Sequence, residues 1–270
     1  MLELKQIESF FPEHLWHFKR NLLREYLQYK VLDAVFGSRY GQKLVFMGGT
    51  AIHIAHGLPR FSEDLDFDNR GLTQKDFSAL IQAVAKKLAL EGYVLETSSS
   101  FKGAFSADIK FKGVLFETGL SGHREEKILI KLDAEPQYPS LSEGLVRASA
   151  QKFQYAPQRL IISKFDVFSG ISVVPADILL AQKFYAILMR KRPMGRDFYD
   201  AIFLAGKAKP DFAYLKERVG IKDKEGLKIA LLGHCAKLDF KLLAREVEQF
   251  LFSPADAKKV LLFTEYVKGL

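Results

Sequence analysis

Residues Phe46 to Phe67 read Phe-Met-Gly-Gly-Thr-Ala-Ile-His-Ile-Ala-His-Gly-Leu-Pro-Arg-Phe-Ser-Glu-Asp-Leu-Asp-Phe. The apolar run 44–47 predicts a short strand, which leads through a Gly48-Gly49 turn into a helical stretch of about two turns that Gly57 ends. Paired glycines let a ligand approach the backbone closely, and the start of a helix offers unpaired N–H groups to a phosphate. The first half of this stretch therefore predicts a phosphate-binding site.

The second half of the stretch predicts a strand that carries two carboxylates. Side chains alternate along a strand, so Asp64 and Asp66 project to one side while Leu65 and Phe67 project to the other. Two carboxylates on one face can share divalent cations, because hard cations prefer oxygen ligands.

The composition is that of a globular chain. With 270 residues, of which 48% are hydrophobic, it can bury a real core in one or two domains. No charge-free apolar run approaches the roughly 18–20 residues that a membrane span needs, and the acidic, aromatic N-terminus does not resemble a signal peptide, so we expect a cytoplasmic protein. The single cysteine, Cys235, excludes a disulfide framework and a multi-cysteine zinc site, and we expect it to be a small core residue.

The positive charge is confined to the second half of the chain. Residues 1–135 hold 18 Lys plus Arg and 18 Asp plus Glu, whereas residues 136–270 hold 22 and 14, so the whole excess of +8 lies there. A polyanion-binding surface has this distribution, and so has a solvated basic helical domain.

Helical periodicity appears twice in the first half. Residues 1–37 have apolar residues at helical spacing and predict one or two amphipathic helices. Residues 72–91 predict a further helix, with Thr73 as its N-cap and Gly92 just past its end.

Period-two patterns follow from residue 93 to residue 168. Residues 105–111 alternate apolar and polar side chains, and a turn at Lys112-Gly113 is expected to lead into a further sheet segment at 114–117. Residues 127–135 put Asp133 at the end of an otherwise apolar strand, which makes it the candidate third metal ligand.

After Pro175 the sequence predicts helices only. They are separated by Gly, Pro and Lys clusters around 192–195, 206–210, 220–226 and 253–256. We therefore expect an α+β domain over residues 1–170, with N-terminal helices, and a helical bundle over residues 171–270.

Four motifs in order resemble the AbiEii/AbiGii-type toxin branch of the nucleotidyltransferase superfamily, and they span about 155 residues. They are Gly48-Gly49-Thr50, Arg60-Phe61-Ser62-Glu63-Asp64-Leu65-Asp66-Phe67, Ala181-Gln182-Lys183 and Arg196-Asp197-Phe198-Tyr199-Asp200. The resemblance implies a nucleotidyltransferase-like mixed sheet with flanking helices ahead of the bundle. The last seventy residues carry no motif of the family.

Lys183 lies within an apolar helical stripe. In a helix over 177–190 its neighbours three and four positions away, at 179, 180, 186 and 187, are all apolar. One interpretation is a lysine whose stem packs while its amine reaches water. The resemblance instead implies that Lys183 meets nucleotide phosphates.

The acids after Gly195 have two interpretations. Acids are common in the first turn of a helix because they complement its dipole. The resemblance makes Asp197 a functional residue near Lys183 and gives Asp200 a more structural part. Arg196 lies in a basic cluster with residues 190–192, which suits a triphosphate or an RNA backbone, or a solvated loop.

The resemblance implies a toxin of a bacterial toxin–antitoxin or phage-defence pair that transfers a nucleoside monophosphate from an NTP to an acceptor, with the 3′ end of tRNA expected. Asp64, Asp66 and Asp133 would bind Mg²⁺, with Mn²⁺ as an alternative, while Gly48, Gly49, Ser62, Lys183 and Arg196 would bind the nucleotide. Asp64, Lys183 and Asp197 would be catalytic. The nucleotide is expected between the two domains.

Other functions stay open. Nucleotidyl or phosphoryl transfer to a protein or small molecule is one alternative, and a non-catalytic RNA- or antitoxin-binding module is another. No P-loop, Gly-x-Ser-x-Gly or Cys/His pair is present. His53 and His56 lie too near the packed interior of a short helix to be preferred as ligands, and His123 and His234 have no partner at metal-ligand spacing.

Overall fold

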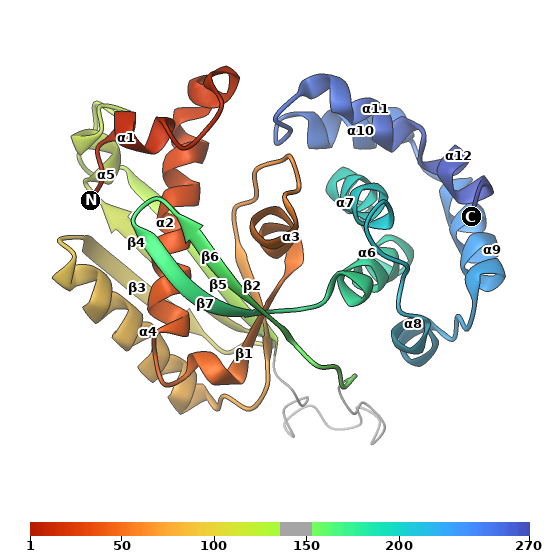
Figure 1. The fold of residues 1–270 in the computed structure, drawn as a ribbon, viewed down its shortest axis with the longest axis horizontal. Coiled ribbons are helices and arrows are strands. Elements are labelled where there is room, and N and C mark those ends of the chain that lie inside the picture. The colour runs from red at the N-terminus through yellow and green to blue at the C-terminus, as the bar shows by residue number, and fades with distance from the viewer. Residues whose placement is uncertain (136–152) are drawn as a thin grey trace. The chain divides into compact units, whose positions relative to one another are not determined.

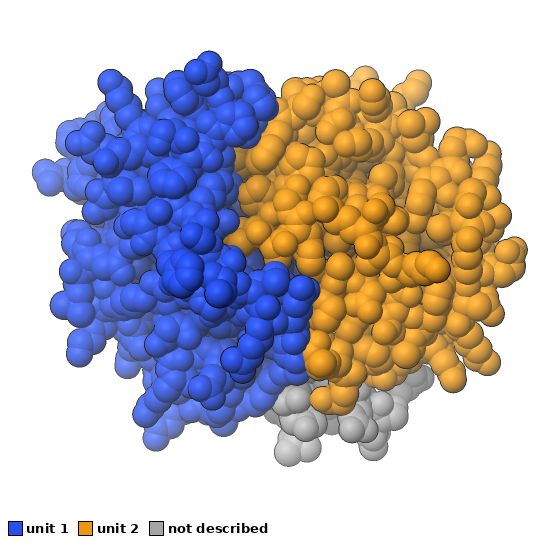
Figure 2. Space-filling model, in the orientation of Figure 1, with its two compact units in different colours: residues 1–51, 62–152, 157–173 blue, residues 52–61, 153–156, 174–270 orange. Residues whose placement is uncertain are grey.

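A computed structural model describes residues 1–135 and 153–270 (Figure 1). The chain divides into two compact units, which Figure 2 distinguishes by colour. The first unit comprises residues 1–51, 62–152 and 157–173, and the second comprises residues 52–61, 153–156 and 174–270. The predicted domain boundary near residue 170 stays a prediction.

A mixed sheet forms the centre of the first unit. Its seven described strands lie in the order β3-β4-β5-β2-β1-β7-β6. The strands are β1 (Leu44–Met47), β2 (Leu65–Asn69), β3 (Val94–Ser100), β4 (Phe105–Lys112), β5 (Lys127–Glu135), β6 (Gln158–Lys164) and β7 (Val167–Val173). β1 pairs with β7 and β2 with β5 in parallel, and the other neighbours are antiparallel.

The alternation predicted for the central strands is confirmed. Every second residue of β4 from Phe105 is buried, and on β5 the buried side chains include Ile128, Ile130 and Leu132. One face of each strand therefore joins the core, as period-two sequences predict. Residues 136–152 of the predicted sheet region lie outside the described residues.

Helices cover this sheet (Figure 1). α1 (Leu4–Glu8), a 3₁₀ segment (Glu13–Phe18) and α2 (Lys19–Phe36) begin the chain, and α4 (Gln74–Leu90) packs against α2, β3 and β4. The helix predicted over 72–91 is confirmed, with its cap: Thr73 Oγ1 accepts from Asp76 N at 3.1 Å, and Asp76 Oδ2 accepts from Thr73 N at 3.2 Å.

α2 differs from the amphipathic helix that the spacing predicts. It packs against α1, α4, β5 and β7, so most of its side chains are buried, charged ones included. Glu25 accepts from Lys164 Nζ at 2.8 Å, and Lys30 Nζ lies 3.2 Å from Asp166 Oδ2. Burying a charge is costly unless it is paired, which is why these side chains meet partners far along the chain.

The prediction of a sheet segment at 114–117 is wrong. Gly113 has φ +73°, and α5 (Val114–Glu117) follows it, with Glu117 N donating to Gly113 O at 2.9 Å. The left-handed glycine turns the chain out of β4, and a single helical turn then buries Val114 and Leu115.

The second unit is helical. Its elements are α6 (Ala176–Met189), α7 (Gly195–Ala205), α8 (Phe212–Val219), α9 (Lys224–Cys235), α10 (Phe240–Glu248), a 3₁₀ turn (Pro254–Ala257), α11 (Lys258–Leu261) and α12 (Phe263–Lys268). The predicted helix breaks are confirmed, and a further break at 236–239 was not predicted. Cys235 is buried, as expected. No helix in the described part of the chain is both long and apolar enough to cross a membrane.

Residues 58–61 also belong to the second unit. Arg60 forms an antiparallel bridge with Leu251, Phe61 N donates to Phe250 O at 2.8 Å, and Phe252 N donates to Pro59 O at 3.2 Å. The segment just ahead of the Asp64-x-Asp66 motif is therefore held by backbone hydrogen bonds to residues 250–252, which connect α10 to the following 3₁₀ turn.

Candidate active site

The predicted Gly-Gly turn is the first turn of a helix. α3 (Gly48–His56) begins directly after β1, and Gly48 has φ +78°, a conformation that side chains disfavour. A Cβ at this position would lie 2.9 Å from both Cβ and Cγ of Asp66. Residue 48 therefore requires glycine for two reasons: its backbone has a positive φ, and the Asp66 side chain leaves no room for a Cβ.

Asp66 and Asp133 lie side by side on parallel strands. They are register partners of β2 and β5, and both are half-buried. Leu65 and Phe67, on the other face of β2, are fully buried. The alternation predicted for Leu65, Asp66 and Phe67 is thus confirmed, and Asp66 and Asp133 lie on the same side of the sheet.

Asp64 lies just before β2 rather than on it. Its carbonyl accepts a short hydrogen bond from Thr50 Oγ1, which ties the loop to the first turn of α3. The preceding carbonyls of Ser62 and Glu63 each accept from Gln28 Nε2 of α2 at 2.9 Å. This loop is therefore held in place from two helices.

A lysine that the sequence did not single out accompanies the acids. Lys131 Nζ lies 2.7 Å from Asp133 Oδ2. The hydrogen bond to Asp133, together with the charges of Asp133, Asp64 and Asp108, raises the pKa of Lys131 although burial opposes it. The ammonium compensates part of the carboxylate charge on this face.

The residues present fit a divalent cation as donors. Asp133 Oδ1 is buried and has no hydrogen-bond partner among residues 1–135 and 153–270. Within the same residues, no group of three Asp, Glu, His or Cys side chains is already gathered as a metal centre. Asp64, Asp66 and Asp133 thus stay predicted ligands, of which Asp66 and Asp133 are adjacent in register.

Lys183 does not reach water with its amine. It lies on α6, its side chain is only 12% exposed, and its Nζ is 2.9 Å from Asp197 Oδ1 and 2.7 Å from Asp200 Oδ2 of α7. Burial alone would lower the pKa of Lys183, but the charges of Asp197 and Asp200 outweigh it and raise the pKa. The ammonium is therefore held charged between two carboxylates.

Arg60 completes this network from the segment before Asp64. Arg60 Nε is 2.6 Å from Asp200 Oδ1 and Nη2 is 2.7 Å from Oδ2, and both side chains are buried. Arg190 Nη1 lies 3.0 Å from Asp197 Oδ2. Three cations thus surround two carboxylates in the second unit, and the group keeps an excess positive charge.

Sequence analysis missed the Arg60–Asp200 pair. The sequence analysis named Arg60 only as part of a motif. Its apolar neighbours Leu58, Pro59 and Phe61 were a signal that the arginine is buried. Of the basic cluster, Arg190 contacts Asp197, whereas Arg196 is half-buried in the first turn of α7.

The mixed sheet with its flanking helices is the fold of solved structures that include a "putative nucleotidyltransferase". Two Helicobacter pylori structures share the fold at 17% identity. JHP933 gives a TM-score of 0.53 over 93% of this chain and 92% of that one. A "putative nucleotidyltransferase" gives 0.54 over 93% and 95%.

The sequence assigns the chain to one family, which is more specific than the shared fold. Residues 30–258 match the sequence family described as "Nucleotidyl transferase AbiEii toxin, Type IV TA system". The chain belongs to this AbiEii family and is a nucleotidyltransferase. The family description also implies an antitoxin partner. No curated protein matches the chain.

Proposed function

We propose that this toxin transfers a nucleoside monophosphate from an NTP to RNA, with the 3′ end of tRNA as acceptor, in an Mg²⁺-dependent reaction. The observation that carries the proposal is the packing of Gly48 against Asp66 beside Asp133. It puts a helix start, which can bind phosphate, directly against paired carboxylates, which can bind a cation. The excess of positive charge in residues 136–270 supports a polyanionic acceptor.

Asp64, Asp66 and Asp133 are the residues that we assign to the divalent cation. Mg²⁺ bound there would neutralise charge on the nucleotide phosphates and favour the deprotonated acceptor hydroxyl. Lys131 Nζ, 2.7 Å from Asp133 Oδ2, limits repulsion between the acids while no cation is bound.

Gly48, Gly49 and Ser62 would bind the phosphates through backbone N–H and hydroxyl groups, and Lys183 and Arg196 through their charges. Asp197 and Asp200 hold the Lys183 ammonium at 2.9 and 2.7 Å. Arg60 pairs with Asp200 and Arg190 with Asp197, so the group around Lys183 keeps a net positive charge. The acceptor hydroxyl attacks the α-phosphorus in line, its proton passes to water, and pyrophosphate leaves.

Asp64→Asn tests the proposal. We expect transfer of label from an α-³²P-labelled NTP to total bacterial RNA to fall by at least about 10²-fold, because a group that stabilises the transition state is lost. Asp33→Asn is the matched control, since Asp33 is a half-buried aspartate of α2 paired with Lys87. Wild-type labelling by Asp64→Asn would refute the mechanism.

The same assay distinguishes the acceptors and the transferred group. If the label appears on a protein or on a small molecule, that molecule is the acceptor instead of RNA. Label transferred from a γ-³²P-labelled NTP would show phosphoryl transfer instead of nucleotidyl transfer. The further proposals of a phage-defence role and a cognate antitoxin are tested by co-expression with neighbouring genes.

A further inference from the structure

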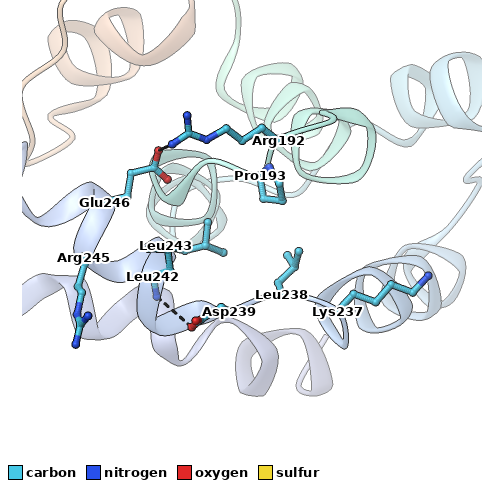
Figure 3. Close-up of a pocket in the computed structure, with 9 residues that line it drawn as sticks. All are labelled: Arg192, Pro193, Lys237, Leu238, Asp239, Leu242, Leu243, Arg245 and Glu246. Carbon is cyan, nitrogen blue, oxygen red and sulfur yellow. Dashed lines mark hydrogen bonds and ion pairs between the residues drawn. The ribbon is translucent and has the colours of Figure 1, made fainter.

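A hollow in the helical unit is not used by the proposed reaction. It has a volume of about 510 Å³ and lies between the α6–α7 connection at 192–193, the α9–α10 connection at 237–239, and α10 (Figure 3). α10 contributes Leu242, Leu243, Arg245 and Glu246. A space of this size can accept several side chains of a partner, or a small ligand.

The floor of the hollow is apolar. Pro193, Leu238 and Leu243 face a common space in Figure 3. Leu242, beside them, is 63% exposed although its neighbour Leu243 is buried. An exposed leucine next to a hollow apolar surface marks an interaction site more often than a leucine that stands alone.

The two acids that line the hollow are already engaged by the fold. Asp239 Oδ1 caps α10, accepting from Lys241 N at 2.9 Å and from Leu242 N at 3.1 Å. Glu246 Oε2 accepts from Gly195 N at 3.1 Å, and its Oε1 lies 3.3 Å from Arg192 Nη2. Both carboxylates are therefore hydrogen-bonded within the fold, and the charge of Glu246 is also paired with that of Arg192.

The cations at the rim remain available. Arg192 is 82% exposed in its side chain despite its contact with Glu246. Lys237 and Arg245, at opposite ends of the hollow in Figure 3, make no ion pair with a carboxylate of the described residues. The hollow is therefore an apolar surface whose lining carries three cations and two carboxylates, an excess of one positive charge.

We propose that this hollow is a docking site for an amphipathic, acidic helix of a partner protein. Aliphatic side chains of that helix would cover Leu242 and fill the space over Leu238 and Leu243, and its carboxylates would meet Lys237 and Arg245. This is the helix-in-groove mode of recognition, with charge complementarity fixing orientation.

A nucleotide base fits the hollow less well. The lining contains no aromatic side chain on which a base would stack, and both lining carboxylates are occupied. The cations stand at separate points of the rim instead of converging on one anion. The lining thus matches a helix better than it matches RNA.

A synthetic peptide tests the site without any nucleotide, so the result is independent of the transfer reaction. The probe is a fluorescein-labelled helical peptide with leucines on one stripe and glutamates elsewhere, titrated with the full chain and followed by anisotropy. A peptide of the same composition with its leucines dispersed controls for charge alone. We expect saturable binding of the striped peptide only.

Two variants locate the binding. Leu242→Glu and Arg245→Glu are each expected to weaken it at least about tenfold, as central contacts of a protein interface do. Ile229→Glu on α9 and Lys216→Glu on α8 are the matched controls, because both residues are exposed in the same unit and outside the lining. We expect these to change the affinity less than twofold.

Three results would overturn the proposal. They are equal binding of the dispersed peptide, unchanged affinity in Leu242→Glu, and an absence of saturation at millimolar concentration. A single-stranded oligoribonucleotide that displaces the peptide and itself loses affinity in Leu242→Glu would identify a nucleic-acid surface instead.

Discussion

Arg60 and Asp200 form a bidentate ion pair across 140 residues of sequence, with both side chains buried. The guanidinium joins the segment at 58–61 to α7, and the carboxylate also contacts Lys183 Nζ at 2.7 Å. Burial opposes both charges. The Arg60 and Lys183 charges nevertheless lower the pKa of Asp200, and the Asp200 charge raises the pKa of Arg60.

Arg60→Met should destabilise the protein strongly. Removing one partner of a buried pair leaves the other charge uncompensated, so we expect the free energy of unfolding to fall by about 3–5 kcal/mol, measured by urea denaturation. Arg60→Met/Asp200→Leu should lose less than the sum of the two single variants. Additive losses would mean that the two charges do not interact.

The pH dependence of stability from this pair follows from the directions in which the pKa values are shifted. Asp200 has a lowered pKa in the folded state, so its contribution to stability is present above about pH 3.8 and is lost as the pH falls through the lowered value. Arg60 and Lys183 have raised pKa values, so their contributions are lost only at strongly alkaline pH. The network should therefore stay intact at neutral pH.

Gly48→Ala should abolish transfer, because alanine at this position is strained and its Cβ would displace Asp66. The strain alone costs about 1–2 kcal/mol. Gly57→Ala is the control, since Gly57 has φ +74° but, apart from its own chain neighbours, no heavy atom of the described residues lies within 4 Å of the place that its Cβ would take. Both variants should melt earlier, and only Gly48→Ala should lose label transfer; equal loss in both would remove the role of the Asp66 contact.

Gly195→Ala should weaken the contact between α7 and α10. A Cβ there would lie 2.8 Å from the carbonyl carbon of Leu243, and backbone cannot yield as a side-chain end can. We expect a loss of about 1–3 kcal/mol in thermal or urea unfolding. Gly233→Ala, at an exposed position of α9 with open space, should instead stabilise by about 0.5–1 kcal/mol. Equal effects would argue against the close packing at Gly195.

His56→Gln should flatten the acid side of the stability profile. Burial first, and the charge of Lys207 second, lower the pKa of His56 below its usual 6.5, and its Nε2 is buried without a partner in the described residues. Below about pH 6.5 the unfolded chain therefore binds the proton more readily, and stability falls. Urea denaturation from pH 7.5 to pH 5 should show a smaller fall in the variant than in His123→Gln, an exposed control.

Local periodicity carried most of the fold prediction. The alternation of β4 and the capped helix after Thr73 are properties of short segments, so the sequence predicts them directly. Residues 114–117 were misassigned because a run of three apolar residues after glycine suits a strand or a helical turn equally. The parallel pairing of β1 with β7 joins distant segments, which no local pattern predicts.

In the candidate site, too, the local features could be predicted from the sequence and the long-range contacts could not. The Gly48-Gly49 start and the facing of Asp66 follow from spacing along one stretch. The closeness of Lys183 to Asp197 was expected from family motifs, whereas the ion pair between Arg60 and Asp200 required the structure. A partner 140 positions away leaves no trace in spacing or composition.

Residues 52–61 belong to the helical unit, and this limits which segments of the enzyme can be exchanged between homologues. A fragment that starts at residue 174 would lack Arg60 and leave Asp200 without its guanidinium. Exchange of the C-terminal helices between homologues is therefore compatible with folding only if the short segment ahead of the Asp64-x-Asp66 motif is inherited with them. Residues 52–61 and 174–270 are therefore expected to evolve together.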